Sequence, residues 1–118
     1  MHYFRATSQE KSVRVSNSIK MAVLVRALRN AFGMSQGYLA QVAGLSRPTL
    51  NRIETMDKRS PRADTLEDLL HVFRSMGVEI TLYDEEINIR FTQPALLAAG
   101  SSLEGNVISE TDGKSDRT

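Results

Sequence analysis

The chain has 118 residues, which is enough for one small domain with short terminal extensions. Its apolar fraction of 41% suffices for a small core, and the absence of cysteine excludes disulfides and thiolate metal sites. No apolar run approaches the roughly 20 residues that span a bilayer, and the N-terminus lacks an apolar stretch of signal-peptide length. We therefore expect a cytoplasmic protein with no membrane partner.

Charge is unevenly distributed along the chain, although the formal net charge is only +1. Residues 18–62 contain eight basic and two acidic residues, a net charge of +6. Residues 63–91 contain two basic and seven acidic residues, a net charge of −5. The basic half is typical of a protein that binds a polyanion, and the acidic half indicates a different role. The alternative interpretation is two differently solvated faces.

A flexible arm over residues 1–17 is the first expected segment, because it has neither a helical nor a strand period. The arm is either a plain disordered terminus or a basic segment that reaches phosphates or the minor groove. A helix over about residues 18–32 follows, and Gly33 suits the position that ends it. Its apolar residues recur at spacings of three and four; they are Met21, Leu24, Val25, Leu28, Ala31 and Phe32.

Two short helices, over about residues 35–42 and 47–56, are predicted to be joined by a tight turn at Gly44. Ser35 and Ser46 are natural N-caps, since their hydroxyls can accept an otherwise unpaired backbone N–H. A helix, a glycine-containing turn and a second helix with an exposed polar face form the helix-turn-helix pattern. In that pattern the second helix enters the major groove of DNA.

The polar residues of this motif are of types that bind DNA. Arginine can bind guanine with two hydrogen bonds, and asparagine or glutamine can bind adenine in the same way. Serine, threonine and lysine suit phosphates. Arg47 is the best placed for a base edge, followed by Gln36, Thr49 and Asn51. The full predicted DNA-binding set is Ser35, Gln36, Ser46, Arg47, Thr49, Asn51, Arg52, Lys58 and Arg59. The three basic residues and Pro61 of the loop 57–64 indicate that this loop could face phosphate. Alternatively, the motif residues are ordinary solvated residues, and residues 57–64 form a merely solvated loop.

A fourth helix over about residues 65–76 is predicted next, stopped by Gly77. Residues 78–91 then alternate between apolar and polar, which predicts one or two strands. An isolated hairpin leaves its edges open, so we predict that the strands pair with a second copy in a two-fold homodimer. The alternative is an intramolecular hairpin packed on the helices. The residues predicted for dimerisation are Val78, Ile80, Leu82, Ile87 and Ile89.

The segment 92–118 is polar and rich in glycine and serine toward its end, so we expect it to be mostly disordered. PALLAAG could form one or two helical turns.

No catalytic residue, metal ligand or cofactor is predicted, so the chain is not expected to be an enzyme. His71 has no carboxylate or histidine near it at metal-ligand spacing, and Asp84, Glu85 and Glu86 form a predicted turn. No phosphate loop, nucleophile elbow or dinucleotide-binding signature occurs.

Residues 25–54, VRALRNAFGMSQGYLAQVAGLSRPTLNRIE, resemble the Xre/Cro-type helix-turn-helix family of bacterial and phage repressors. The resemblance implies a mainly α, lambda-repressor-like DNA-binding domain of four to five helices over residues 18–77. It also implies DNA contacts by Gln36 and by the exposed face of the third helix, and a structural ion pair between Arg29 and Glu54. The matching residues are Leu28–Arg29, Gly33 to Gln36, Leu39–Ala40, Gly44 to Ser46 and Ile53–Glu54.

Residues 65–86, TLEDLLHVFRSMGVEITLYDEE, resemble the HipB-type antitoxins, in which the fourth helix runs into a strand that pairs across a dimer. This resemblance implies a repressor that binds a palindromic operator in double-stranded DNA, controls its own operon and binds a HipA-like kinase toxin. No residue is assigned to the toxin contact. The alternative is a stand-alone Xre-family or phage-type repressor without a toxin partner.

Overall fold

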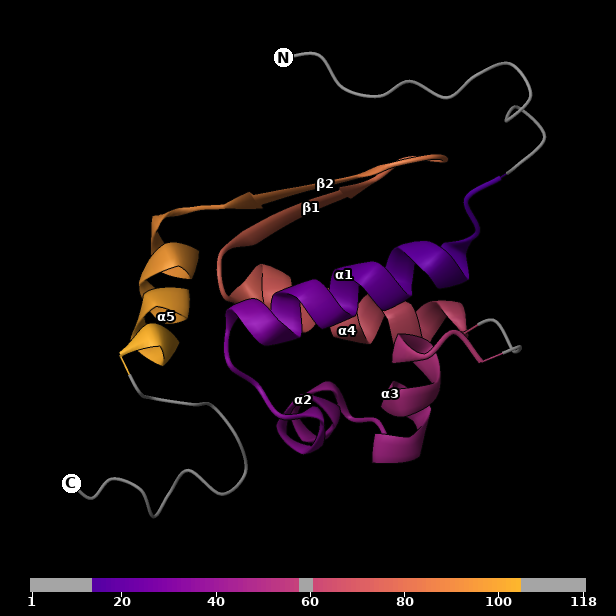
Figure 1. Cartoon of the computed structure of the whole chain (residues 1–118), viewed down its shortest axis with the longest axis horizontal. Coiled ribbons are helices and arrows are strands. Elements are labelled where there is room, and N and C mark those ends of the chain that lie inside the picture. The colour runs from indigo at the N-terminus through magenta and orange to yellow at the C-terminus, as the bar shows by residue number, and fades with distance from the viewer. Residues whose placement is uncertain (1–13, 58–60, 105–118) are drawn as a thin grey trace.

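The computed structural model describes residues 14–57 and 61–104, and the described chain contains five helices and one β-hairpin (Figure 1). The hairpin runs along one side of α1. On the opposite side of α1 lie α2 and α3, and α5 lies at the end of the hairpin. The predicted mainly α fold with a short β element is confirmed. The elements are α1 Asn17–Ala31, α2 Gln36–Ala43, α3 Arg47–Glu54, α4 Ala63–Ser75, β1 Val78–Leu82, β2 Ile87–Phe91 and α5 Gln93–Leu103.

Serine caps set the starts of the first three helices. Ser16, Ser35 and Ser46 each accept a hydrogen bond from the backbone N–H three residues later. The chain leaves α2 through Gly44, whose φ of +75° lies in the left-handed region that glycine adopts without strain. Because these signals are local, the predicted bounds of α1 to α4 lie within two residues of the observed ones.

The core is formed by the inward stripes of the helices together with the inner face of the hairpin. Phe32 of α1 connects these layers, because its ring stacks on Phe73 of α4 at 6.2 Å and on Phe91 of β2 at 5.8 Å. The largest fully buried side chains are Phe32, Phe73, Met21, Leu24, Leu28, Leu39, Leu50, Leu69, Val25 and Val78. Five of these ten residues belong to the apolar stripe predicted for the first helix.

β1 and β2 pair with each other in an antiparallel hairpin, with Ile80 opposite Ile89. The hairpin is thus intramolecular and packs on the helices, and its pairing with a second copy stays a prediction. Val78 and Ile80 are only 1% and 7% exposed, because they are buried in the core of their own chain. Of the five residues predicted for dimerisation, Leu82, Ile87 and Ile89 keep exposed surface.

After Thr92 only one or two helical turns in PALLAAG were expected, whereas residues 93–103 form one continuous helix, α5. Packing against the core and a hydrogen bond at its start help to hold this helix. Ala95 is fully buried in the core, and the Thr92 hydroxyl donates a 2.6 Å hydrogen bond to the carbonyl of Gly77. Residues 105–118, and residues 1–13 of the predicted arm, lie outside the described residues.

Candidate nucleic-acid interface

The outer face of α3 carries a set of exposed polar side chains on a helix whose other face is buried. Leu50 and Ile53 are 0% and 6% exposed and anchor α3 to the core. Arg47 and Asn51 are exposed and lie one helical turn apart, so they face the same way. Arg52 is also exposed and Thr49 is half-buried. The structure therefore brings together an arginine and an asparagine at the spacing that neighbouring base contacts need.

Two hydroxyls fix the start of α3. Ser46 Oγ accepts a 3.2 Å hydrogen bond from the backbone N–H of Thr49, and the two hydroxyl oxygens lie 2.8 Å apart. A hydroxyl has one donor and two acceptor positions, so each group can still offer a further hydrogen bond. Ser46 is therefore a cap in this structure, and its predicted contact with DNA stays a prediction.

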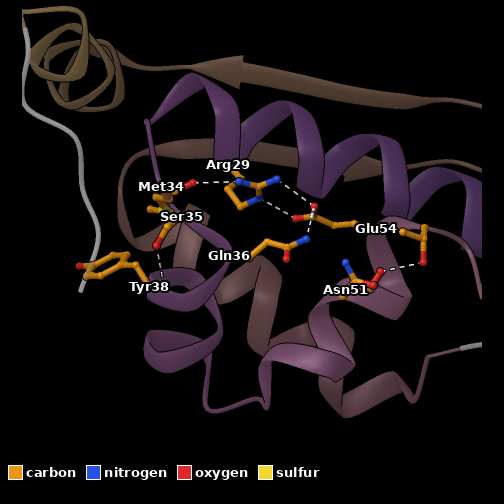
Figure 2. A network of polar contacts seen from close by, with 8 residues as sticks. Arg29, Met34, Ser35, Gln36, Tyr38, Asn51 and Glu54 are labelled. Atoms are coloured by element: carbon orange, nitrogen blue, oxygen red, sulfur yellow. Dashed lines mark hydrogen bonds and ion pairs between the residues drawn. The ribbon is translucent and has the colours of Figure 1, made fainter. Parts of the chain in front are cut away.

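A buried carboxylate holds α1, α2 and α3 together directly behind this face (Figure 2). Glu54 is 4% exposed and is the one buried charged residue in the part of the chain that the structure describes. Its carboxylate accepts from Arg29 Nε at 2.7 Å and from Arg29 Nη2 at 3.0 Å. Arg29 Nη1 also donates to the carbonyl of Met34 at 3.0 Å. The implied Arg29–Glu54 ion pair is thus present, with the two-bond geometry that makes such pairs strong.

Gln36 has a role that the sequence did not indicate. Its side-chain Nε2 donates to Glu54 Oε1 at 3.0 Å, so the amide completes the buried network and points back toward α3 (Figure 2). One N–H of this amide is therefore committed to Glu54. An adenine contact would use the second N–H and the amide oxygen, and this base contact stays a prediction. No local sequence pattern could have shown this contact, because Gln36 and Glu54 are 18 residues apart and meet only when the turn at Gly44 is closed.

A hollow of about 400 Å³ lies beside α3, between the turn of the motif and the start of α4. Two arginines and three hydroxyl residues line it, which are the side-chain types that bind phosphate. They are Arg52, Arg62, Ser46, Thr49 and Thr65. Arg62 belongs to the loop 57–64, whose three basic residues indicate a possible phosphate-facing loop, but it was not included in the predicted DNA-binding set. Lys58 and Arg59 lie outside the described residues.

Within residues 14–57 and 61–104, no group of three or more histidine, aspartate or glutamate side chains could hold a metal ion. No helix in the same residues is long and apolar enough to cross a membrane.

Residues 25–76 match the helix-turn-helix family model HTH_3. The match covers the α3 face, the Glu54 network and all of α4, and it stops before the hairpin and α5. The matched segment is thus similar to helix-turn-helix domains, and this similarity supports a DNA-binding transcription regulator. Comparison with curated proteins found no match, and comparison with solved structures also found none.

Proposed function

We propose that this protein is a transcriptional repressor that binds a palindromic operator in the cytoplasm as a two-fold dimer and blocks transcription by occupying it. The observation that carries the proposal is the exposed polar face of α3, held in place by the buried Glu54 network. A recognition helix needs side chains that read base edges on a rigid support, and α3 has both.

In the proposed complex Arg47 reads a base edge at the start of α3, and Asn51 reads a base one turn further along. Arg52 and Arg62, on the rim of the neighbouring hollow, neutralise phosphates on the flanking backbone. The net charge of +6 over residues 18–62 supports this arrangement, since phosphate contacts provide much of the affinity for DNA.

An open strand edge supports the dimer. The Tyr83 N–H donates to Glu86 O at 2.8 Å, so by alternation Ile87, Ile89 and Phe91 direct their backbone groups away from β1. The equivalent edge of β1 is partly occupied, because Arg74 Nη2 donates to the carbonyl of Ile80 at 3.0 Å. Pairing along β2 would extend the hairpin into a four-stranded sheet, with half-sites about one helical turn of DNA apart.

The test begins with selection of a binding sequence from randomised duplex DNA, followed by fluorescence anisotropy on the selected site. We expect Arg47→Ala and Asn51→Ala each to weaken binding by about 1–3 kcal/mol. Arg26→Ala is the matched control, because it removes a guanidinium from another exposed position, on α1. If Arg47→Ala and Arg26→Ala weakened binding equally, the assignment of α3 as the recognition helix would be wrong.

The second candidate function is that of an antitoxin that also binds a HipA-like kinase. Exposed acidic residues on α4 and at the hairpin turn support it; they are Asp64, Glu67, Asp68, Asp84, Glu85 and Glu86. Co-expression with the product of the adjacent gene tests this proposal. A stable complex that survives gel filtration is expected, and a stand-alone repressor would give none.

A further inference from the structure

Helix α5 has its large apolar side chains on the outside and its small ones on the inside. Ala95 is fully buried, and the two alanines that follow it on the inner side, Ala98 and Ala99, are packed against the core. A helix that serves only its own chain shows the reverse pattern, with leucines turned inward. The outward leucines are Leu96 at 59%, Leu97 at 69% and Leu103 at 87% exposure.

The outward residues form one continuous strip. Leu96, Gly100 and Leu103 are four and three residues apart, so they line up along the helix, and Leu97 flanks them. We call these four residues the leucine face. An exposed apolar strip of this kind marks a contact with another molecule, because single scattered apolar residues would suffice if the surface had no partner.

Gly100 has no explanation within its own chain. A Cβ atom added there would meet nothing within 4 Å, so no close approach of the chain to itself requires glycine. A glycine in a helix interior nevertheless destabilises it by roughly 0.5–1 kcal/mol relative to alanine. The close approach of a second helix to the leucine face would account for the missing side chain.

We propose that the leucine face binds the leucine face of a second copy of this chain. A two-fold contact centred on Gly100 lets the two backbones approach closely and places the leucines of each helix around the other. Residues 93–103 contain no charged side chain, so two copies meet without repulsion and a charged partner finds nothing complementary.

The contact is compatible with DNA binding but independent of it. In Figure 1, α5 and α3 lie at opposite ends of the helical part of the molecule, so joining two copies through α5 leaves both recognition faces uncovered. The inference therefore goes beyond the proposed function and stands even if the protein binds no DNA.

Sedimentation velocity on the full chain tests the proposal. The surface area that a single helix face can bury is smaller than the roughly 800 Å² per partner of a standard interface. We therefore expect a weak contact, with dimerisation at micromolar concentrations. Leu97→Gln/Leu103→Gln should raise the dissociation constant of the leucine-face contact at least tenfold. If the β2 edges also pair, the wild-type chain forms species larger than a dimer and this variant stops at the dimer. Glutamine keeps helix propensity, and circular dichroism checks folding. Val42→Gln, at a 45% exposed position on α2, is the control and should change the constant less than twofold.

A crosslinking experiment locates the centre of the contact, since the chain contains no cysteine. Under mild oxidation Gly100→Cys should form disulfide-linked dimers at least tenfold faster than Ala27→Cys, which is an exposed position on α1. Three results would each overturn the proposal: a wild-type chain that stays monomeric at 200 µM, a dimer unaffected by the double leucine variant, or equal crosslinking at the two cysteine positions.

Discussion

Replacement of Glu54 by alanine should be among the most destabilising single changes in the described chain. It removes the acceptor of two hydrogen bonds from Arg29 and one from Gln36. Breaking a buried ion pair by removing one partner destabilises a protein by roughly 3–5 kcal/mol. The Arg29 side chain is 25% exposed and can turn partly to water, so we expect a loss near the lower end, about 3 kcal/mol.

Urea denaturation followed by circular dichroism measures this loss. Glu54→Gln preserves the shape but not the charge, so it should lose less, about 1–2 kcal/mol. Glu67→Ala, which removes an exposed carboxylate with a 3.9 Å ion pair, is the control and should change stability by less than about 0.5 kcal/mol. The reasoning fails if Glu54→Ala loses less than about 1 kcal/mol, or if the same change is equally destabilising in an Arg29→Met background.

Two further predictions concern the glycine at the end of α4 and the outer face of the hairpin. Gly77→Ala should destabilise by more than about 2 kcal/mol in thermal unfolding, and Gly44→Ala by only about 1 kcal/mol. Both glycines have positive φ, but a Cβ at Gly77 would lie 2.7 Å from the Thr92 hydroxyl, whereas one at Gly44 meets nothing within 4 Å. The hydrogen bond and charge of Arg90 lower the pKa of Glu79 below its ordinary value of 4.5. A lowered carboxyl pKa stabilises the fold above the ordinary pKa, and this contribution disappears as pH falls through the lowered value. The melting temperature of the wild-type chain should therefore fall slightly as pH is lowered from 5 to 2.5, and Glu79→Gln should make this fall smaller. An equal fall in the wild type and the variant would contradict the prediction.

Local signals account for the parts of the fold that the sequence predicted. The hydroxyls of Ser35 and Ser46 can be recognised as helix caps without knowledge of any distant residue, and Gly44 marks a turn by its own conformational freedom. The period of two after Gly77 likewise predicts the strands from neighbours alone, although not that they pair with each other. The α3 face follows, because a capped helix with Leu50 and Ile53 inward must turn Arg47 and Asn51 outward.

The remaining features depend on contacts that no local pattern records. The sequence indicated at most one or two turns of α5, because its inward face consists of small residues, and buried alanines leave no amphipathic signal of the usual kind. Gln36 is a helix-start residue of a type suited to DNA, and only the folded structure shows its amide directed to Glu54.

The Glu54 network also determines how variants of α3 must be interpreted. α3 has eight residues, which is far below the length at which an isolated helix is stable in water. Its recognition geometry therefore depends on Glu54 and on the buried Leu50 and Ile53, and any change behind the face also weakens DNA binding. A lost DNA contact and a lost support behind the face can be told apart by how the affinity for DNA depends on salt. Loss of a phosphate contact such as Arg52 reduces the slope of affinity against salt by about one, whereas a destabilised but intact face lowers affinity at every salt concentration with the same slope.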